Sequence, residues 1–257
     1  MIFDTHAHYD DEAFNEDREQ LIEELKASDI KRIVNVGANL RTSKNSVDLS
    51  EKYDLFYVAV GVHPDDADEV TDEGIEILRK LSEAKKVVAI GEIGLDYYWN
   101  KDNMDLQKEA FRRQIELAKE LSLPIIVHSR EAAQDTMDIL KETNAGQTVG
   151  GVVHCFSYSP EIATEAVKMG FYIGVGGVVT FKNAKKLKET VEIIPLEKIV
   201  LETDCPYLAP DPFRGKRNSS LYLEYVVKEI SRLKGIDENT VMEQTYKNAL
   251  DMYRMNS

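Results

Sequence analysis

Short runs of apolar and β-branched residues alternate with longer amphipathic stretches from one end of the chain to the other. The short runs predict strands, because β-branched residues suit a buried extended backbone, and the longer stretches predict helices. No low-complexity tract or Pro/Gly-rich linker interrupts this alternation. The predicted strands are Ile2–Thr5, Arg32–Gly37, Phe56–Val62, Val87–Glu92, Pro124–His128, Gly151–His154, Tyr172–Gly176 and Ile199–Thr203.

A stretch with helical patterning follows each predicted strand. Two of these stretches begin with a capping hydroxyl and early acids, at Thr71-Asp72-Glu73 and at Ser159-Pro160-Glu161. Apolar strands separated by amphipathic helices favour a parallel sheet covered by helices. Examples of the helical stretches are Asp17–Ser28, Thr71–Ser82, Leu106–Leu121, Glu131–Lys141, Pro160–Met169 and Leu221–Leu233.

Eight strand-and-helix units in succession predict an α/β fold closed into a (β/α)8, or TIM, barrel. A doubly wound open sheet is the alternative, but it would normally collect its site at one switch point. The length of 257 residues is usual for one such barrel, so we expect a single domain over residues 1–257.

Composition restricts the functions available to the chain. The formal net charge of −14 argues against a protein that coats nucleic acid through its overall charge. A nuclease is still allowed, because bound metal ions dominate the field of a small site. The two cysteines, Cys155 and Cys205, form no spaced framework, and the chain shows neither a signal peptide nor a membrane span. We therefore expect a cytoplasmic protein.

Polar residues gather where the predicted strands end, and all five histidines of the chain are used this way. In a parallel barrel these ends point to one rim, where active sites of the fold are built. The residues in question are His6 and His8 after the first strand, His63 after the third, Glu92 at the fourth, His128 and Arg130 at the fifth, His154 at the sixth, and Glu202 and Asp204 at the eighth.

These residue types suit a pair of divalent metal ions. Side chains separated by one residue in extended chain project to the same side, so His6 and His8 can grip one ion together. Glu92 can bridge two ions through its two carboxylate oxygens. His128 and His154 can complete the second ion, while Asp204 can bind the first and reach its water.

A metal pair lowers the pKa of a bridging water and steadies a leaving oxygen, which gives a hydroxide nucleophile at neutral pH. The residue types leave the metal open. Histidines favour Zn, Mn or Ni, whereas carboxylates and phosphate chemistry permit Mg. Each residue alone also has a simpler interpretation, since a buried histidine often only packs and an acid at a strand end often caps the next helix. Five strand ends that each offer a ligand favour the metal centre.

At this point the motifs match a known family. The chain resembles, over its whole length, the TatD-type metal-dependent deoxyribonucleases of the amidohydrolase superfamily. The segments that carry the resemblance are Phe3-Asp4-Thr5-His6-Ala7-His8, Gly61-Val62-His63-Pro64, Gly91-Glu92-Ile93-Gly94-Leu95-Asp96-Tyr97-Tyr98, Ile126-Val127-His128-Ser129-Arg130, His154-Cys155-Phe156-Ser157 and Glu202-Thr203-Asp204-Cys205-Pro206-Tyr207-Leu208.

The resemblance implies a (β/α)8 barrel that hydrolyses DNA phosphodiesters with two divalent metal ions, often from the 3′ end. It implies that His63 contacts the substrate phosphate and that Glu202 orients a ligand histidine from behind. The implied ligands of one ion are His6, His8, Glu92 and Asp204, and those of the other are Glu92, His128 and His154.

Two further segments are candidates for contacts with the substrate. Arg214-Gly215-Lys216-Arg217-Asn218 resembles a family stretch whose cations can clamp phosphates, and Arg130 is another candidate. A solvated loop is the alternative for this stretch. Tyr97-Tyr98-Trp99 offers aromatic faces for an unpaired base, although such rings often only pack under their loop.

The leading hypothesis is a metal-dependent deoxyribonuclease that acts on single-stranded DNA or 3′ ends. Asp204 would accept the proton of the attacking water, and His63 and Arg130 would balance charge on the phosphate. The alternatives are an amidohydrolase-type enzyme that cleaves an aminoacyl ester, amide or lactone, and a binding module that lost turnover. No membrane partner is expected, and the oligomeric state stays open.

Overall fold

The computed structural model describes residues 1–255 and shows a barrel of eight parallel strands, in the order in which they occur along the chain. Every predicted strand is present. The strands are β1 (Ile2–Ala7), β2 (Ile30–Val36), β3 (Phe56–Val60), β4 (Val87–Asp96), β5 (Ile125–Arg130), β6 (Gly151–Val153), β7 (Phe171–Val175) and β8 (Ile199–Leu201).

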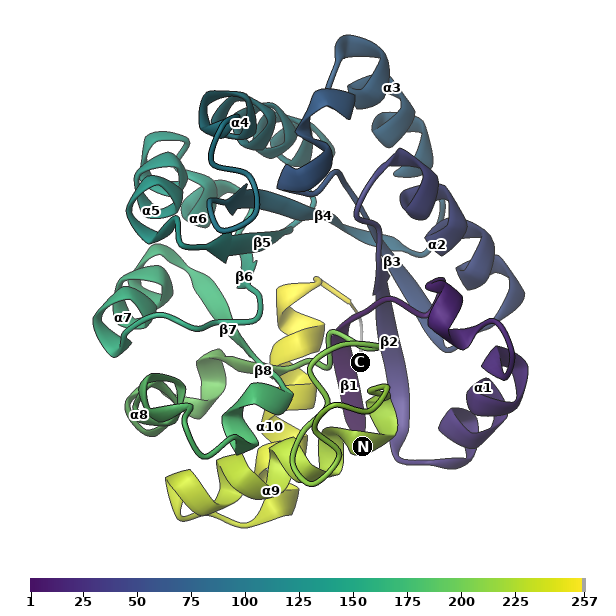
Figure 1. Ribbon diagram of the computed structural model, residues 1–257, viewed down its shortest axis with the longest axis vertical. Coiled ribbons are helices and arrows are strands. Elements are labelled where there is room, and N and C mark those ends of the chain that lie inside the picture. The colour runs from purple at the N-terminus through teal and green to yellow at the C-terminus, as the bar shows by residue number, and fades with distance from the viewer. Residues whose placement is uncertain (256–257) are drawn as a thin grey trace.

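Helices cover the outside of the ring of strands (Figure 1). Thr71 caps α3 as expected, since its side chain accepts a hydrogen bond from the amide of Gly74. Ser159 precedes α7, with Pro160 as the first helical residue, but the predicted capping by its hydroxyl was wrong, because the Ser159 side chain makes no capping hydrogen bond. The helices are α1 (Arg18–Ala27), α2 (Leu40–Lys52), α3 (Asp72–Leu81), α4 (Met104–Leu121), α5 (Ala133–Glu142), α6 (Ala145–Thr148), α7 (Pro160–Met169), α8 (Lys185–Ile193), α9 (Leu223–Lys234) and α10 (Glu238–Met252).

The ring closes between β1 and the segment that follows β8. A parallel bridge joins Ala7 to Cys205, and the amides of Thr203 and Asp204 both donate to the carbonyl of His6. The buried carboxylate of Asp4 strengthens this seam, because it accepts from the Thr203 amide at 3.0 Å and the Thr203 hydroxyl at 2.6 Å. The (β/α)8 prediction is therefore confirmed, and closure brings residues 6 and 204 together.

Alternate residues of each strand face two different cores. One set, which includes Phe3, Val34 and Ile126, forms a cluster inside the barrel with the C-terminal end of α10. The other set, which includes Ile33 and Ile125, packs beneath the surrounding helices. Because α10 lies across one end of the barrel, that end is filled with apolar side chains and only the opposite end is left for a site (Figure 1).

The predicted end of the fourth strand was wrong. It was placed at Glu92, but β4 continues to Asp96 after an irregularity between Ile90 and Ile93. The extra residues pair with the end of β5, where Gly94 lies beside His128. Gly94 has a φ of +147°, and an added Cβ would lie 2.0 Å from the His128 carbonyl oxygen, so only glycine fits this close approach.

Among residues 1–255, none of the helices has both the length and the apolar character needed to cross a bilayer.

Candidate metal centre

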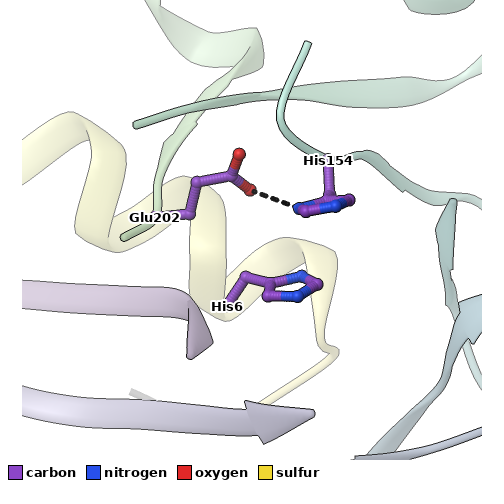
Figure 2. Close-up of side chains that lie close together, drawn as sticks. All are labelled: His6, His154 and Glu202. Carbon is purple, nitrogen blue, oxygen red and sulfur yellow. Dashed lines mark ion pairs between the residues drawn. The ribbon is translucent and has the colours of Figure 1, made fainter. Parts of the chain in front are cut away.

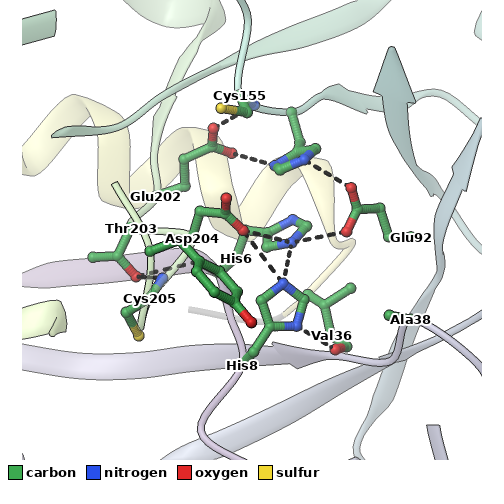
Figure 3. Close-up of polar contacts among 12 residues, drawn as sticks. His6, His8, Val36, Ala38, Glu92, Cys155, Glu202, Thr203, Asp204 and Cys205 are labelled. Carbon is green, nitrogen blue, oxygen red and sulfur yellow. Dashed lines mark hydrogen bonds and ion pairs between the residues drawn. The ribbon is translucent and has the colours of Figure 1, made fainter. Parts of the chain in front are cut away.

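The imidazoles of His6 and His8 leave β1 on the same side of the strand and lie together at the open end of the barrel (Figure 3). Their Nε2 atoms are 3.2 Å apart. The Oδ1 atom of Asp204 lies 3.7 Å from Nε2 of His6 and 3.3 Å from Nε2 of His8. On the far side of its ring, Nδ1 of His8 donates to the Val36 carbonyl at 2.8 Å, so Nε2 is the nitrogen that faces Asp204.

Glu92 lies at the centre of the cluster and is 5 % exposed. Its Oε2 atom is 3.4 Å from Nε2 of His6. Its Oε1 atom is 2.9 Å from Nε2 of His154, 2.6 Å from Nδ1 of His128 and 3.9 Å from Nε2 of His63. One carboxylate oxygen thus faces the β1 histidines and the other faces the remaining three, which is the arrangement of a residue able to bridge two cations.

The electrostatics of the cluster favour a cation. Burial opposes ionisation of Glu92, but the interactions with His154 and with His128 hold its pKa well below the usual value. Burial likewise opposes protonation of His128, yet Glu92 and Asp96 raise its pKa to about 9. A field that keeps a proton on a buried imidazole also attracts a divalent ion, which would displace that proton.

The donor atoms fit divalent metal ions. Imidazole nitrogen and carboxylate oxygen are the ligands that Zn, Mn and Ni take in proteins, and Mg accepts the carboxylates. Within residues 1–255, three groups of side chains have ligand atoms within 4.8 Å of one another, and Glu92 belongs to two of them. The groups are His6, His8 and Glu92; His63, Glu92 and His128; and His6, His154 and Glu202.

Glu202 lies on the Nδ1 side of the His154 ring (Figure 2), whereas Glu92 faces Nε2 of that ring. Its Oε1 atom accepts from the Cys155 amide at 2.5 Å, and its Oε2 atom lies 3.8 Å from Nδ1 of His154. Gly174 makes room for this carboxylate, because an added Cβ would lie 2.3 Å from Oε2. Burial raises the pKa of Glu202 to about 7. Glu202 therefore faces the back of a candidate ligand and lies outside the group of side chains around Glu92.

His63 follows β3 and presents a hydrogen-bond donor to the open end of the barrel. Its Nδ1 atom accepts from the Asp65 amide at 3.2 Å, whereas the Asp65 carboxylate lies farther away at 3.5 Å. Burial and the neighbouring His128 lower the pKa of His63 to about 4, so the ring is neutral. With Nδ1 used as an acceptor, the proton resides on Nε2, which faces Glu92 and the cavity.

A cavity of about 1090 Å³ opens above these side chains, and charged residues of both signs line it. Two of them are arginines, Arg41 after β2 and Arg130 at the end of β5. The turn after β1 supplies acids to the lining, Asp10, Asp11 and Glu12. Sequence reasoning identified Arg130 but missed Arg41, because no motif marks that position.

Arg214 and Arg217, in the loop after β8, lie outside the cavity. Arg217 forms a two-pronged ion pair with Asp17, at 2.7 and 2.5 Å, and its guanidinium lies over the ring of Phe14. Arg214 lies over Phe181, 4.3 Å from the ring centroid. Neither arginine is among the residues that line the cavity, so both contacts hold the loop against the barrel.

A parallel barrel whose mouth gathers imidazoles around a buried carboxylate has the architecture of the metal-dependent hydrolases. The family model of the TatD related DNases matches residues 3–254. The chain belongs to this family, as its motifs predicted.

Individual relatives cover the whole chain. It is 49 % identical to the uncharacterized metal-dependent hydrolase YabD of Bacillus subtilis, over 100 % of both chains. It is 31 % identical to the 3'-5' ssDNA/RNA exonuclease TatD of Cronobacter sakazakii, over 100 % of this chain and 99 % of that one. The crystal structure of YJJV, a TatD homolog from Escherichia coli K12, superposes with a TM-score of 0.93 at 30 % identity and covers 99 % of this chain and 98 % of its own.

Proposed function

We propose that this chain is a metal-dependent exonuclease that hydrolyses phosphodiester bonds at the 3′ end of single-stranded DNA. The observation that carries the proposal is the position of Glu92, whose two oxygens face separate groups of histidines beneath a cavity that two arginines help to line. The exonuclease name of the Cronobacter sakazakii relative supports this substrate class.

Two divalent cations would be held at the cluster, one by His6, His8 and Asp204 and one by His128 and His154, with Glu92 shared between them. When bound, such a pair supplies an acidified water and neutralises negative charge on the phosphate. The remaining chemistry belongs to side chains around the pair.

Asp204 is the proposed proton acceptor. Burial opposes its ionisation, but the hydrogen bond from His8 and the nearby His154 and His6 lower its pKa, so it is a carboxylate at neutral pH. A carboxylate beside the attacking water takes up the proton that the water loses as its oxygen bonds to phosphorus. The bond from phosphorus to the leaving 3′ oxygen breaks in the same reaction, and that oxygen takes a proton from solvent.

His63, Arg130 and Arg41 are the proposed contacts of the phosphate. The Nε2–H group of His63 faces the cavity and can donate to a non-bridging oxygen whose charge grows in the transition state. The two arginines add positive charge to the lining of the cavity. Glu202 is the proposed positioning residue for His154, because it faces the Nδ1 side of that ring.

A metal-by-substrate matrix tests the proposal. The chain is stripped with a chelator, reloaded with Zn, Mn, Ni or Mg, and assayed on single-stranded DNA, duplex DNA, RNA and an aryl ester. We expect hydrolysis that requires added metal, proceeds one nucleotide at a time from a 3′-hydroxyl end, and is faster on single strands than on duplexes. Turnover of the ester without cleavage of any oligonucleotide would contradict the proposal and favour a carboxyl-ester or amide hydrolase.

A further inference from the structure

The loop that follows β4 exposes two large aromatic side chains at the rim of the cavity. Tyr98 is 46 % exposed and Trp99 is 65 % exposed. Tyr97 is turned away from them, and its hydroxyl donates to the Asp135 carboxylate at 2.7 Å. Packing under the loop thus explains Tyr97, and it leaves the exposure of the next two rings unexplained.

Arg130 connects the two rings to the cavity. Its guanidinium lies 4.1 Å from the centroid of Tyr98 and 5.5 Å from that of Trp99, and the same residue lines the cavity above the histidines. The two rings meet edge to face, with centroids 4.7 Å apart. Together Tyr98, Trp99 and Arg130, here called the aromatic clamp, form an exposed aromatic cluster with a positive charge packed against it.

Backbone hydrogen bonds fix the aromatic clamp relative to the candidate metal ligands. One carboxylate oxygen of Asp96 accepts from the amides of Tyr98 and Trp99, at 2.8 and 3.0 Å. The other oxygen lies 3.2 Å from Nε2 of His128. A single buried side chain therefore holds the loop on one side and a candidate ligand on the other, so a group resting on the clamp has a defined distance to the centre.

The charge of the cavity lining indicates the path of a polyanion. Acids of the turn after β1 repel a phosphate chain, whereas Arg130, which lines the cavity and lies over the ring of Tyr98, attracts it toward the aromatic clamp. An exposed indole beside an arginine suits the unpaired base of such a strand, because every nucleobase has a face that stacks.

We propose that the aromatic clamp stacks an unpaired nucleobase of the substrate, next to the nucleotide whose phosphodiester is cut. The inference rests on the proposed function and names the feature of a single strand that the site recognises. Base pairing hides these faces in a duplex, so the clamp selects single-stranded ends.

Trp99 is the only tryptophan of the chain, so intrinsic fluorescence reports on the clamp directly. The titration uses the Asp204→Asn variant, in which we expect binding without turnover. This variant is titrated with a single-stranded DNA nonamer. We expect the base-bearing strand to quench Trp99 emission. A nonamer of abasic tetrahydrofuran units has the same charge and should leave the emission unchanged.

The affinity for DNA is measured separately, from the fluorescence anisotropy of the same nonamer labelled with a dye. In the Asp204→Asn background, Trp99→Ala should weaken binding about tenfold, since stacking contributes about 1–3 kcal/mol per base, and Trp99→Phe should restore most of it. The matched control is Ile193→Ala, an apolar residue of α8 that is 61 % exposed and should bind like the parent.

Unchanged Trp99 emission at saturating nonamer, equal quenching by the abasic strand, or unaltered affinity of Trp99→Ala would each overturn the inference. The result separates the two proposals. Cleavage of DNA without participation of Trp99 rejects the clamp alone, whereas base-dependent quenching in a chain that cleaves no oligonucleotide with any metal rejects the exonuclease alone.

Discussion

The two ends of the barrel interior are built from the same strands but are lined by different kinds of side chain. At the end covered by α10, Phe3 packs against Tyr253, whose hydroxyl donates to the Thr5 carbonyl at 2.7 Å. At the open end, three residues after Phe3 in β1, the interior holds His6 against Glu92. One end is thus apolar with its polar atoms paired, and the other is a buried cluster of titratable groups.

The difference shows which end is built for stability and which for a ligand. Among the described residues, four buried side-chain atoms have no hydrogen-bond partner, and three of them lie at the open end. They are Nδ1 of His6, Nδ1 of His154 and Oε2 of Glu202. Such atoms cost about 1–3 kcal/mol each, so the open end is less stable by itself than its packing would allow.

Loss of the shared carboxylate should have the largest effect. Glu92→Gln should reduce kcat at least about a thousandfold, because both cation positions depend on this side chain. The fold should persist, as judged by circular dichroism and thermal melting. Glu243→Gln, a matched change on the exposed surface of α10, should retain the parental kcat. Substantial turnover by Glu92→Gln would remove the carboxylate from the centre.

A change at the closed end should lower stability and leave turnover unchanged. Phe3 is buried, and Phe3→Ala should lower the free energy of unfolding by about 3–5 kcal/mol, through lost packing against Tyr246 and Tyr253. Urea titration measures that loss, and kcat per folded molecule should stay at the parental value. A drop below about 1 kcal/mol, or a selective loss of kcat, would show that the two ends are not separate in this way.

Glu202→Gln should have an intermediate effect. The variant keeps the side-chain shape beside Gly174 but weakens the charge that faces His154, so we expect metal affinity to fall about 10- to 100-fold. Competition with a fluorescent chelator measures the affinity. At saturating metal, kcat should fall by a smaller factor than the metal affinity does. Equal affinity in the two proteins would exclude Glu202 as a positioning residue.

The smallest effects should separate the two groups of arginines. Arg130→Gln should raise KM for single-stranded DNA about tenfold, because its side chain lines the cavity. Arg217→Gln should hardly change KM and should cost only about 0–1 kcal/mol of stability, since its pair with Asp17 is on the surface. The opposite ranking in KM would restore the phosphate clamp that the sequence suggested for Arg214 and Arg217.

Much of the fold was predictable because strand, helix and strand-end chemistry repeat with each unit. His6, His8 and Asp204 meet because parallel strands bring their ends to one rim, a rule that needs no knowledge of side-chain packing. The predicted end at Glu92 failed for a tertiary reason. β4 continues because β5 offers it a partner as far as Arg130, and propensity along one strand does not contain that information.

The cation contacts were the least predictable part of the site. Arg217 lies in a basic stretch, but its partner Asp17 is 200 residues away in the sequence, so only the closed barrel shows that the charge is already paired. Arg41 carries no motif and reaches the cavity only because α2 starts at the rim. Asp96 lay within a recognised motif, yet its contacts with His128 and with the aromatic loop depend on the extension of β4.

Anomalous diffraction from crystals soaked in Mn or Zn is the decisive test of the metal centre, because it locates cations without an assumption about the substrate. We expect two peaks roughly 3.5–4 Å apart on either side of Glu92, one beside His6, His8 and Asp204 and one beside His128 and His154. Ordered crystals with no peak at Glu92, or with metal bound only elsewhere on the surface, would contradict it.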